Sequence, residues 1–402
     1  MAKLAIKGGK PVHTTGWSGW PIIDESDVEK VADVVRSGIF GFGPRVAEFE
    51  AKFAKYMDAE YGVCTNAGTT AIQTALGAAG VGAGDEVIIP PYTFVATASA
   101  VFDANGTPVF ADIDPDNYCL DPKSVEQMIT NKTKAIITVH LGGCPTDMDT
   151  LMALAKKHNL MVIEDSAHAH GARYKGKAVG ALGHLGCFSF QSSKNLNCGE
   201  GGIVLTNHRA LYDRCSAYHN SRRLPSGAIG SADDIVGTNF RMTEFQGAML
   251  LAQFERFEEQ SNIREANGMF LTEQLRQMGG FKIPRPSYTT RHGYHIISIT
   301  YEAKEFKGLS LGDFIGAMNA EGIPCSGGYG ALYKDGMFQS PISRRPVTRS
   351  SDYYSSLCLP NTEELSTKTI WIFHTVLLGS RKDMEDIVEA VAKIKKNIDE
   401  LI

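Results

Sequence analysis

The sequence lacks the features that mark a membrane protein or a nucleic-acid-binding protein. Its longest uncharged apolar stretch, 87–102, is interrupted by Pro90 and Pro91 and is shorter than the roughly 20 residues of a membrane helix. Lys plus Arg number 40 against 45 Asp plus Glu, for a net charge of −5. No block of about five or six like charges occurs. We therefore expect neither a membrane span nor a nucleic-acid partner.

A secretory leader and a disulfide framework are also missing. Residues 1–10 contain three lysines, but no apolar core of about 7–15 residues follows them. The eight cysteines include no C-x-x-C pair. We therefore expect a cytoplasmic protein whose thiols are reduced and mostly structural.

Several common ligand-binding and catalytic motifs are absent as well. The glycine-rich pieces at 41–44 and 80–84 match neither a dinucleotide-binding fingerprint nor a G-x-x-x-x-G-K-[ST] phosphate loop. No G-x-S-x-G or H-E-x-x-H motif occurs. The sequence thus argues against the commonest hydrolases and zinc proteases.

The composition is that of a globular protein with more than one domain. With 402 residues, 43% apolar and 21% charged, the chain is long enough for a large α/β domain plus a smaller one. A long helical pattern reaches about Met278, and Pro284 and Pro286 follow it. We predict an N-terminal segment at 1–25 that could pack on the small domain, a large domain at 26–278 and a small C-terminal α/β domain at 279–402.

In the large domain, short apolar runs alternate with stretches of helical spacing. This pattern predicts a mostly parallel sheet with crossover helices, whose ligands bind at the carboxyl ends of the strands. The seven predicted strands are 63–65, 86–89, 108–113, 135–140, 160–164, 186–191 and 202–206. A helix before the sheet should begin with Ser26 as N-cap and Glu29 in a capping box, bury Val28 and Val35, and end at Gly38.

The segment Asn66-Ala67-Gly68-Thr69-Thr70-Ala71 lies where the first strand turns into a helix. Small residues there let backbone amides approach a phosphate, and a helix N-terminus supplies unpaired N–H groups and the positive end of the dipole. A threonine-capped helix with nothing bound fits the same residues. Both interpretations stay open on this segment alone.

Asp165 ends the strand 160–164, and His168 and His170 follow it. A metal site could use these three side chains, although the remaining ligands have no evident source. Alternatively, Asp165 could face the positively charged ring nitrogen of a cofactor. His168 by itself could equally be a buried histidine with a hydrogen-bond partner.

Lys194 follows the strand 186–191 in a loop rich in Ser and Gly. Most lysines are simply solvated. A lysine this close to a buried strand could be desolvated, which lowers its pKa toward the range of Schiff-base chemistry. Asp165 and Lys194 could then face each other across a ring.

Nearly the whole chain resembles the DegT/DnrJ/EryC1/StrS family of sugar aminotransferases. The resemblance implies pyridoxal phosphate as cofactor and the aspartate-aminotransferase fold (fold type I), with the seven-stranded, mostly parallel sheet in the large domain. The matching pieces, in chain order, are Gly43-Pro44 with Phe49-Glu50, Gly68-Thr69-Thr70-Ala71, Tyr92-Thr93-Phe94-Val95-Ala96-Thr97, Asp112-Ile113-Asp114, Val139-His140-Leu141 with Pro145-Thr146-Asp147-Met148, Glu164-Asp165, Ser189-Phe190 with Lys194, Gly199-Glu200-Gly201-Gly202, and Gly237-Thr238-Asn239-Phe240-Arg241-Met242.

The resemblance also implies roles for individual residues. Lys194 would hold the cofactor as a Schiff base, and Asp165 would pair with its protonated ring nitrogen. The remaining cofactor contacts would be stacking by Phe94, and phosphate binding by the helix start at Gly68, Thr69 and Thr70 together with the hydroxyl of Ser189. Asn239 would reach the neighbouring subunit's phosphate, so a homodimer with shared sites is implied. His168, where the family usually has Gln, would lie beside the cofactor's phenolic oxygen.

The implied reaction moves an amino group from glutamate or glutamine to a ketone of a sugar, nucleotide-linked or not, or of a cyclitol. Tyr329, Tyr333 and Arg241 are candidate substrate-side residues, and each could equally be a packing residue. The alternatives are a metal-dependent hydrolase built on Asp165, His168 and His170, a related ketosugar dehydratase, an iron–sulfur relative, and a regulatory protein without catalysis. The dehydratase carries His at the lysine position, so Lys194 argues against it, and the scattered cysteines argue against an iron–sulfur cluster.

Overall fold

The large domain is built on one seven-stranded sheet in this computed structural model, which describes residues 3–339 and 347–402. The strand order is β1-β9-β8-β5-β4-β2-β3. Only β9 runs antiparallel to its neighbours within this sheet. The bounds are β1 Tyr61–Thr65, β2 Glu86–Ile89, β3 Thr107–Phe110, β4 Thr133–Val139, β5 Met161–Asp165, β8 Leu185–Ser189 and β9 Gly202–Thr206. The predicted sheet is thereby confirmed.

Helices cover both faces of this sheet because its buried strands are apolar on both sides. Val87 and Ile89 pack into one cluster, whereas Ile88 between them packs into another, as the alternation along a strand requires. The helices of this domain are α2 Pro44–Tyr56, α3 Gly68–Ala78, α4 Ala96–Asp103, α5 Pro122–Met128, α6 Met148–His158, α7 Arg209–His219 and α8 Glu244–Met278. No helix of the described chain combines the length and the apolar character of a membrane crossing.

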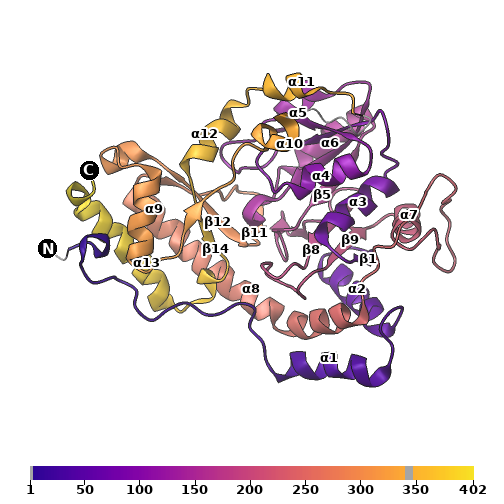
Figure 1. The fold of residues 1–402 in the computed structure, drawn as a ribbon, viewed down its shortest axis with the longest axis horizontal. Helices are drawn as coiled ribbons and strands as arrows, with labels where there is room; N and C mark the ends of the chain where they lie inside the picture. Colours follow the sequence, from indigo (N-terminus) through magenta and orange to yellow (C-terminus); the bar gives the residue numbers. More distant parts are fainter. Residues whose placement is uncertain (1–2, 340–346) are drawn as a thin grey trace.

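A second, antiparallel sheet carries the small C-terminal unit. Its strand order is β10-β12-β14-β13, and α9 and α13 pack on it (Figure 1). The bounds are β10 Phe281–Lys282, β12 Ile296–Tyr301, α9 Leu311–Ala320, β13 Ser326–Gly327, α12 Pro360–Lys368, β14 Thr369–Phe373 and α13 Arg381–Lys396. The short helices α10 Gly336–Gln339 and α11 Ser351–Ser355 pack on the large domain instead, where Phe338 and Tyr354 are buried in its core. A small third sheet pairs β11 Thr289–Arg291 with β6 Arg173–Tyr174 and β7 Lys177–Ala178.

The long helix α8 joins the two units. Its first half packs with α2 and the large sheet, and its last turns pack in the core of the small unit (Figure 1). The N-terminal segment lies on the small unit: Leu4 is buried in its core, and the indole N–H of Trp17 donates to the carbonyl of Gly322 (2.9 Å). The domain boundaries at 25 and 278 remain predictions.

Helix α1 (Glu25–Ser37) differs from its prediction in cap and in orientation. Its N-cap is Asp24, not Ser26, and Asp24 forms the capping box with Asp27. Asp27 is 1% exposed, and the side chains of Gln253 (2.8 Å) and Arg256 (2.7 Å) of α8 donate to its carboxylate. These buried polar contacts turn α1 so that Val28 and Val35 are 53% and 60% exposed. Gly38 ends the helix as expected, with φ +67°.

Candidate active site

A cavity of about 560 Å³ lies at the carboxyl ends of β4, β5 and β8, where ligands of such sheets bind. The start of α3 and the loop before α4 form its other large-domain walls, and residues of the small unit close it. Its lining comprises Ala67, Gly68, Thr69, Ile72, Thr93, Phe94, Ala96, Thr97, Val139, Asp165, Ala167, His168, Cys187, Phe188, Ser189, Gln191, Ser193, Lys194, Glu200, His295, Ile296, Tyr329, Trp371 and Phe373.

Asp165, the last residue of β5, presents a buried carboxylate to this cavity. The hydroxyl of Thr97 donates to its Oδ2 (2.9 Å), and the amide of Ala167 donates to its Oδ1 (3.2 Å). Burial raises the pKa of Asp165, and these two bonds and Lys194 oppose that shift. Since both hydrogen-bond donors are neutral and no cation of the described residues forms an ion pair with Asp165, a cationic group bound in the cavity would supply an opposite charge in direct contact.

The neighbouring Glu164 points away from the cavity, because successive side chains of a strand face opposite sides. The amides of Gly180 (2.7 Å), Leu182 (2.8 Å) and Gly183 (2.6 Å) donate to its carboxylate. Nδ1 of His140 accepts from the amide of Thr146 (3.1 Å), so the neutral ring carries its proton on Nε2 and donates to Glu164 (2.9 Å). Glu164 therefore fixes the end of β5 without taking part in the cavity.

Lys194 lies in the loop between β8 and β9, half-buried at the cavity wall. Burial lowers the pKa of its ammonium to about 8, and the negative charge of Asp165 opposes that shift. At pH 8 about half of such amines are unprotonated, against less than about 1% for an ordinary lysine. Lys194 is therefore poised for nucleophilic attack on a carbonyl carbon.

The start of α3 provides an anion-binding end to the cavity. Its N-cap is Ala67, which has no side-chain oxygen to accept the first helical amides. Gly68 and Thr69 line the cavity there, together with Ser189. A Cβ atom on Gly68 would lie 2.6 Å from the Cβ of Ser189, so only glycine allows this close approach. Free amides, a positive helix end and a hydroxyl are the groups that bind a phosphate.

The side chain of Thr70, a residue that the family resemblance assigns to the phosphate site, does not line the cavity. Its hydroxyl accepts from the amide of Ala67 (3.1 Å) and donates to Asn66 (2.8 Å). Thr70 thus caps the helix by its side chain, which is the alternative that the sequence left open for this position. Only its backbone amide is available to an anion at this helix start.

His168 lines the cavity, whereas His170 does not. The imidazole of His170 lies among Phe53, Phe188 and Phe190, and its Nε2 donates to the carbonyl of Ser189 (2.9 Å). Among the described residues, the only potential metal-ligand cluster is His13, Asp383 and Asp386. The metal-site alternative on Asp165, His168 and His170 is therefore wrong, because their ligand atoms do not converge.

His295, from the start of the small-unit sheet, packs against His168 at 4.4 Å between ring centroids. The amide of Gly142 donates to Nδ1 of His168 (3.4 Å), so the neutral ring carries its proton on Nε2. Burial lowers the pKa of both imidazoles well below the ordinary value. The part of the cavity wall that these two rings form is therefore polar but uncharged.

The three candidate substrate-side residues lie in different places. Tyr329 lines the cavity, where its amide donates to the hydroxyl of Tyr92 (3.1 Å). Tyr333 is buried in the hydrophobic core, and its hydroxyl donates to Glu363. Its prediction as a substrate-side residue is wrong for this reason. Arg241 lies over the ring of Phe42, at 4.9 Å, outside this cavity.

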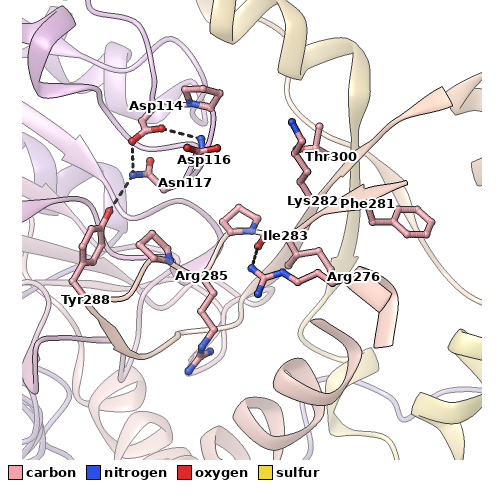
Figure 2. Close-up of a pocket in the computed structure, with 13 residues that line it drawn as sticks. Asp114, Asp116, Asn117, Arg276, Phe281, Lys282, Ile283, Arg285, Tyr288 and Thr300 are labelled. Atoms are coloured by element: carbon pink, nitrogen blue, oxygen red, sulfur yellow. Dashed lines mark hydrogen bonds between the residues drawn. The ribbon is translucent and has the colours of Figure 1, made fainter. Parts of the chain in front are cut away.

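A second cavity, of about 540 Å³, separates the loop after β3 from the segment around β10 (Figure 2). Several of its polar groups have partners within the chain. Asp114 accepts from the amide of Asp116 (2.9 Å) and from Asn117 (3.2 Å), and Arg285 donates to Glu265 (2.5 Å). It therefore has no free reactive group comparable to Asp165 and Lys194.

Comparison with known proteins agrees with the chemistry of the first cavity. The model of the DegT/DnrJ/EryC1/StrS aminotransferase family matches residues 21–392. The chain belongs to this family. It is 35% identical over 418 residues to the L-glutamine:2-deoxy-scyllo-inosose aminotransferase of Streptomyces fradiae, covering 99% of this chain and 98% of that one. The enzyme of the same name from Streptoalloteichus tenebrarius is 36% identical over 419 residues, covering 99% of each chain.

Solved structures of this family share the fold. The aminotransferase from Psychrobacter cryohalolentis is 32% identical with a TM-score of 0.85, covering 95% of this chain and 100% of that chain. 3-Amino-5-hydroxybenzoic acid synthase is 28% identical with a TM-score of 0.82 and the same coverage. The predicted family, the type I fold and the assignment as a pyridoxal-phosphate-dependent aminotransferase are confirmed.

The cavity of this aminotransferase fits pyridoxal phosphate. It offers a carboxylate held by neutral donors, an amine with a lowered pKa, and a helix start whose glycine cradle has free amides. These groups match a cationic ring nitrogen, an aldehyde and a phosphate, respectively.

Sequence reasoning missed several residues of this site. Thr93 and Thr97, whose hydroxyls lie 2.9 Å apart, connect the loop before α4 to Asp165. The quoted motif around Phe94 contains both threonines, so a search for donors to the strand-end carboxylate could have found them. The small unit contributes His295, Trp371 and Phe373 to the cavity lining. No local sequence pattern predicts this contribution.

Proposed function

We propose that this aminotransferase transfers the amino group of L-glutamine to the keto carbon of a free ketocyclitol of the scyllo-inosose type. The observation that carries the proposal is the similarity, over nearly the whole of both chains, to aminotransferases named for L-glutamine and 2-deoxy-scyllo-inosose. Nucleotide-linked ketosugars are the alternative acceptors.

The charge of the cavity supports a neutral acceptor. Among the described residues that line it, Lys194 is the one Lys or Arg, and Asp165 and Glu200 are acidic. The two imidazoles of His168 and His295 are held neutral by burial. A nucleotide-linked sugar would bring two phosphate charges, which need cationic partners when they are buried. A cyclitol needs only hydrogen-bond donors and acceptors, which neutral imidazoles such as those of His168 and His295 supply.

We assign the cofactor contacts as follows. Asp165 pairs with the ring nitrogen, and Phe94 lies against the ring. The amides of Gly68, Thr69 and Thr70, with the hydroxyl of Ser189, bind the phosphate. His168 presents Nε2–H to the phenolic oxygen. The positions of these residues around one cavity support this assignment.

The bound cofactor supplies an aldehyde carbon and an electron-withdrawing ring. Lys194 Nζ, unprotonated in part near neutral pH, would take the proton from the α-carbon of the donor and pass it to the former aldehyde carbon of the bound cofactor in the same half-reaction, and in the second half-reaction would move a proton in the reverse direction, onto the acceptor carbon. Asp165 keeps negative charge next to the ring nitrogen, which stabilises its cationic form. Thr97 and Ala167 hold the Asp165 carboxylate in place through their hydrogen bonds.

A half-reaction screen tests the acceptor and the donor. The holoenzyme is converted with L-glutamine, or with L-glutamate in parallel, and freed of the donor. A ketone is then added while the visible absorbance of the coenzyme is followed. We expect a scyllo-inosose ketone to restore the starting spectrum about 100-fold faster than a nucleotide-linked ketosugar or pyruvate, because a difference of about 2.7 kcal/mol in transition-state binding gives that ratio. Restoration by the ketosugar or by pyruvate alone would contradict the proposed acceptor.

We further propose that the enzyme is a homodimer with shared sites. The outer face of α1 and the segment after it expose Val28, Val35, Phe40 and Phe42, an apolar group that a second copy could cover. Asn239 does not line the cavity of its own chain. It lies in an isolated bridge with Asn220, close to Arg241. This position leaves Asn239 free to serve the partner's phosphate site.

Mixed dimers test the shared site. Lys194→Ala and Asn239→Ala chains carrying different tags are co-expressed, and the doubly tagged species is isolated. Each homodimer should have little activity, whereas the mixed dimer contains one site with both residues intact. We expect it to reach about half of the wild-type activity per dimer. A mixed dimer no better than the Asn239→Ala homodimer, or a monomer in light scattering, would contradict the shared-site proposal.

A further inference from the structure

The loop that carries Lys194, residues 191–199, has two exposed residues directly before the lysine, Ser192 and Ser193. Within the loop, the amide of Ser192 donates to the carbonyl of Gly199 (2.8 Å) and the amide of Lys194 donates to the carbonyl of Gln191 (2.8 Å). These bonds shape the turn, but they do not attach it to the rest of the molecule.

Two ring N–H groups from distant parts of the chain attach this loop from outside. The indole Nε1 of Trp20, in the N-terminal segment, donates to the carbonyl of Ser192 (3.0 Å). Nε2 of His374, directly after β14 of the small unit, lies 2.8 Å from the carbonyl of Ser193 and donates to it, since a carbonyl can only accept. Each of the two peptide carbonyls that precede Lys194 thus has its own donor.

A third contact holds the residue after the lysine. The side-chain amide of Asn195 donates to the carbonyl of Gly293 (2.8 Å), so its Oδ1 is free to accept from Nδ1 of His295 (3.0 Å). Gly293 and His295 belong to the approach to β12 of the small unit. Contacts from outside the loop therefore bracket Lys194 on both sides.

The two ring donors also contact each other. The rings of Trp20 and His374 meet edge to face at 4.8 Å, and His374 stacks on His295 at 5.2 Å. Arg264 of α8, 1% exposed, lies over Trp20 at 5.2 Å, and none of its guanidinium nitrogens has a hydrogen-bond partner among the described residues. Burial and the charge of Arg264 lower the pKa of His374 well below its ordinary value, so the ring remains a neutral Nε2–H donor.

We infer that Trp20 and His374 are positioning residues that hold the Lys194 loop, so that the amine faces the cavity only when the N-terminal segment and the small unit are both seated on the large domain. Neither residue lines the cavity. Their effect on the reaction therefore passes through the two serine carbonyls. The inference adds to the proposed role of Lys194 and rests on it for its catalytic consequence.

Paired substitutions separate the hydrogen bond from packing. His374→Gln keeps an N–H donor on a flexible side chain, whereas His374→Phe keeps a ring against Trp20 but loses the donor. Trp20→Phe loses the indole donor and keeps an aromatic ring near Arg264. Trp17→Phe is the matched control, because Trp17 makes the same kind of bond from the same segment, but to Gly322.

The first measurement is amide hydrogen exchange of the peptide containing residues 190–198 in cofactor-free protein. We expect exchange to rise about fivefold in His374→Phe and in Trp20→Phe, the size expected for the loss of one hydrogen bond. His374→Gln should stay within about twofold of wild type, and Trp17→Phe should not change this peptide. The inference is overturned if His374→Phe leaves exchange unchanged, or if His374→Gln is as impaired as His374→Phe.

The second measurement uses the holoenzyme and records two quantities: the pH at which the visible absorbance band of the coenzyme titrates, and the steady-state kinetic constants. Displacement of the Lys194 amine in His374→Phe should shift that pH from its wild-type value. It should also lower kcat about tenfold and leave KM for the acceptor within twofold of wild type. His374→Gln should retain most of the wild-type kcat. Failure of the proposed role of Lys194 would look different: Lys194→Ala would then retain activity, whereas the exchange result, obtained without cofactor, would be unaffected.

Discussion

Lys194→Ala is expected to abolish transamination, with kcat/KM reduced by about 10⁴-fold or more. The substitution removes both the nucleophile that attacks the cofactor carbonyl and the base that moves the α-proton, and no other lysine or arginine among the described residues lines the cavity. Both half-reactions should fail in stopped-flow absorbance, because the same amine serves each of them.

The control for this variant is Lys132→Ala, at an exposed lysine outside the cavity, which should have wild-type kinetics. Neither variant should unfold below the wild-type temperature, since Lys194 is only half-buried and burial destabilises its ammonium in the folded state. Activity in Lys194→Ala within tenfold of wild type would refute the assignment of the nucleophile.

The pH dependence of the cofactor-free protein gives a second readout for Lys194. The folded pKa of about 8 lies below the ordinary value of 10.5, so the folded state binds fewer protons than the unfolded state between these values. The free energy of unfolding should therefore rise with pH across about 8 to 10.5 through this group. The rise should be missing in Lys194→Ala, and a rise of equal size in that variant would place the titration elsewhere.

Asp165→Asn is expected to lower kcat by about 10²- to 10³-fold. The asparagine keeps the shape, with its Oδ1 able to accept from the amide of Ala167 and its Nδ2 able to donate to the hydroxyl oxygen of Thr97, but it no longer places negative charge beside the ring nitrogen. Losing one such electrostatic contact in a buried site costs about 2.7–4 kcal/mol of transition-state stabilisation. The substitution should also lower the pKa of Lys194 further, because the Asp165 charge raises it.

Asp149→Asn is the matched control, since Asp149 is exposed and pairs with Lys175 (2.5 Å) far from the cavity. Its kinetics should equal those of wild type. Single-turnover measurements on holoenzyme at saturating L-glutamine separate the chemical step from coenzyme binding. A kcat in Asp165→Asn within threefold of wild type would show that the carboxylate does not support the charge of the ring.

Local patterns predicted the sheet and the two central residues. The strands at 86–89 and 202–206 appear with the predicted bounds, because a fully buried strand must be apolar along its whole length. Asp165 and Lys194 could be placed at the same edge because each follows such a strand, and the carboxyl ends of parallel strands share one edge.

Predictions for single polar and aromatic side chains were less successful where two uses of the same residue type compete. The threonines at the start of α3 could cap the helix or help to bind an anion, and the hydroxyl of Thr70 caps it. Tyr333 follows a glycine-rich turn, as a substrate-side residue could, but it packs on Phe110 in the core. His170 has a strand-end position like that of His168, yet three phenylalanines enclose it. Each outcome depends on neighbours that are distant in sequence.

By itself, the sequence determined the α/β class, the family and the edge of the sheet at which the chemistry occurs, because strand periodicity and short motifs are local properties. Only the tertiary structure decided which residues close the cavity. His295, Trp371 and Phe373 reach it from the small unit, about 100 residues or more beyond Lys194 in the chain. Their contribution depends on how two separately formed cores pack against each other through α8, and no local pattern encodes that packing.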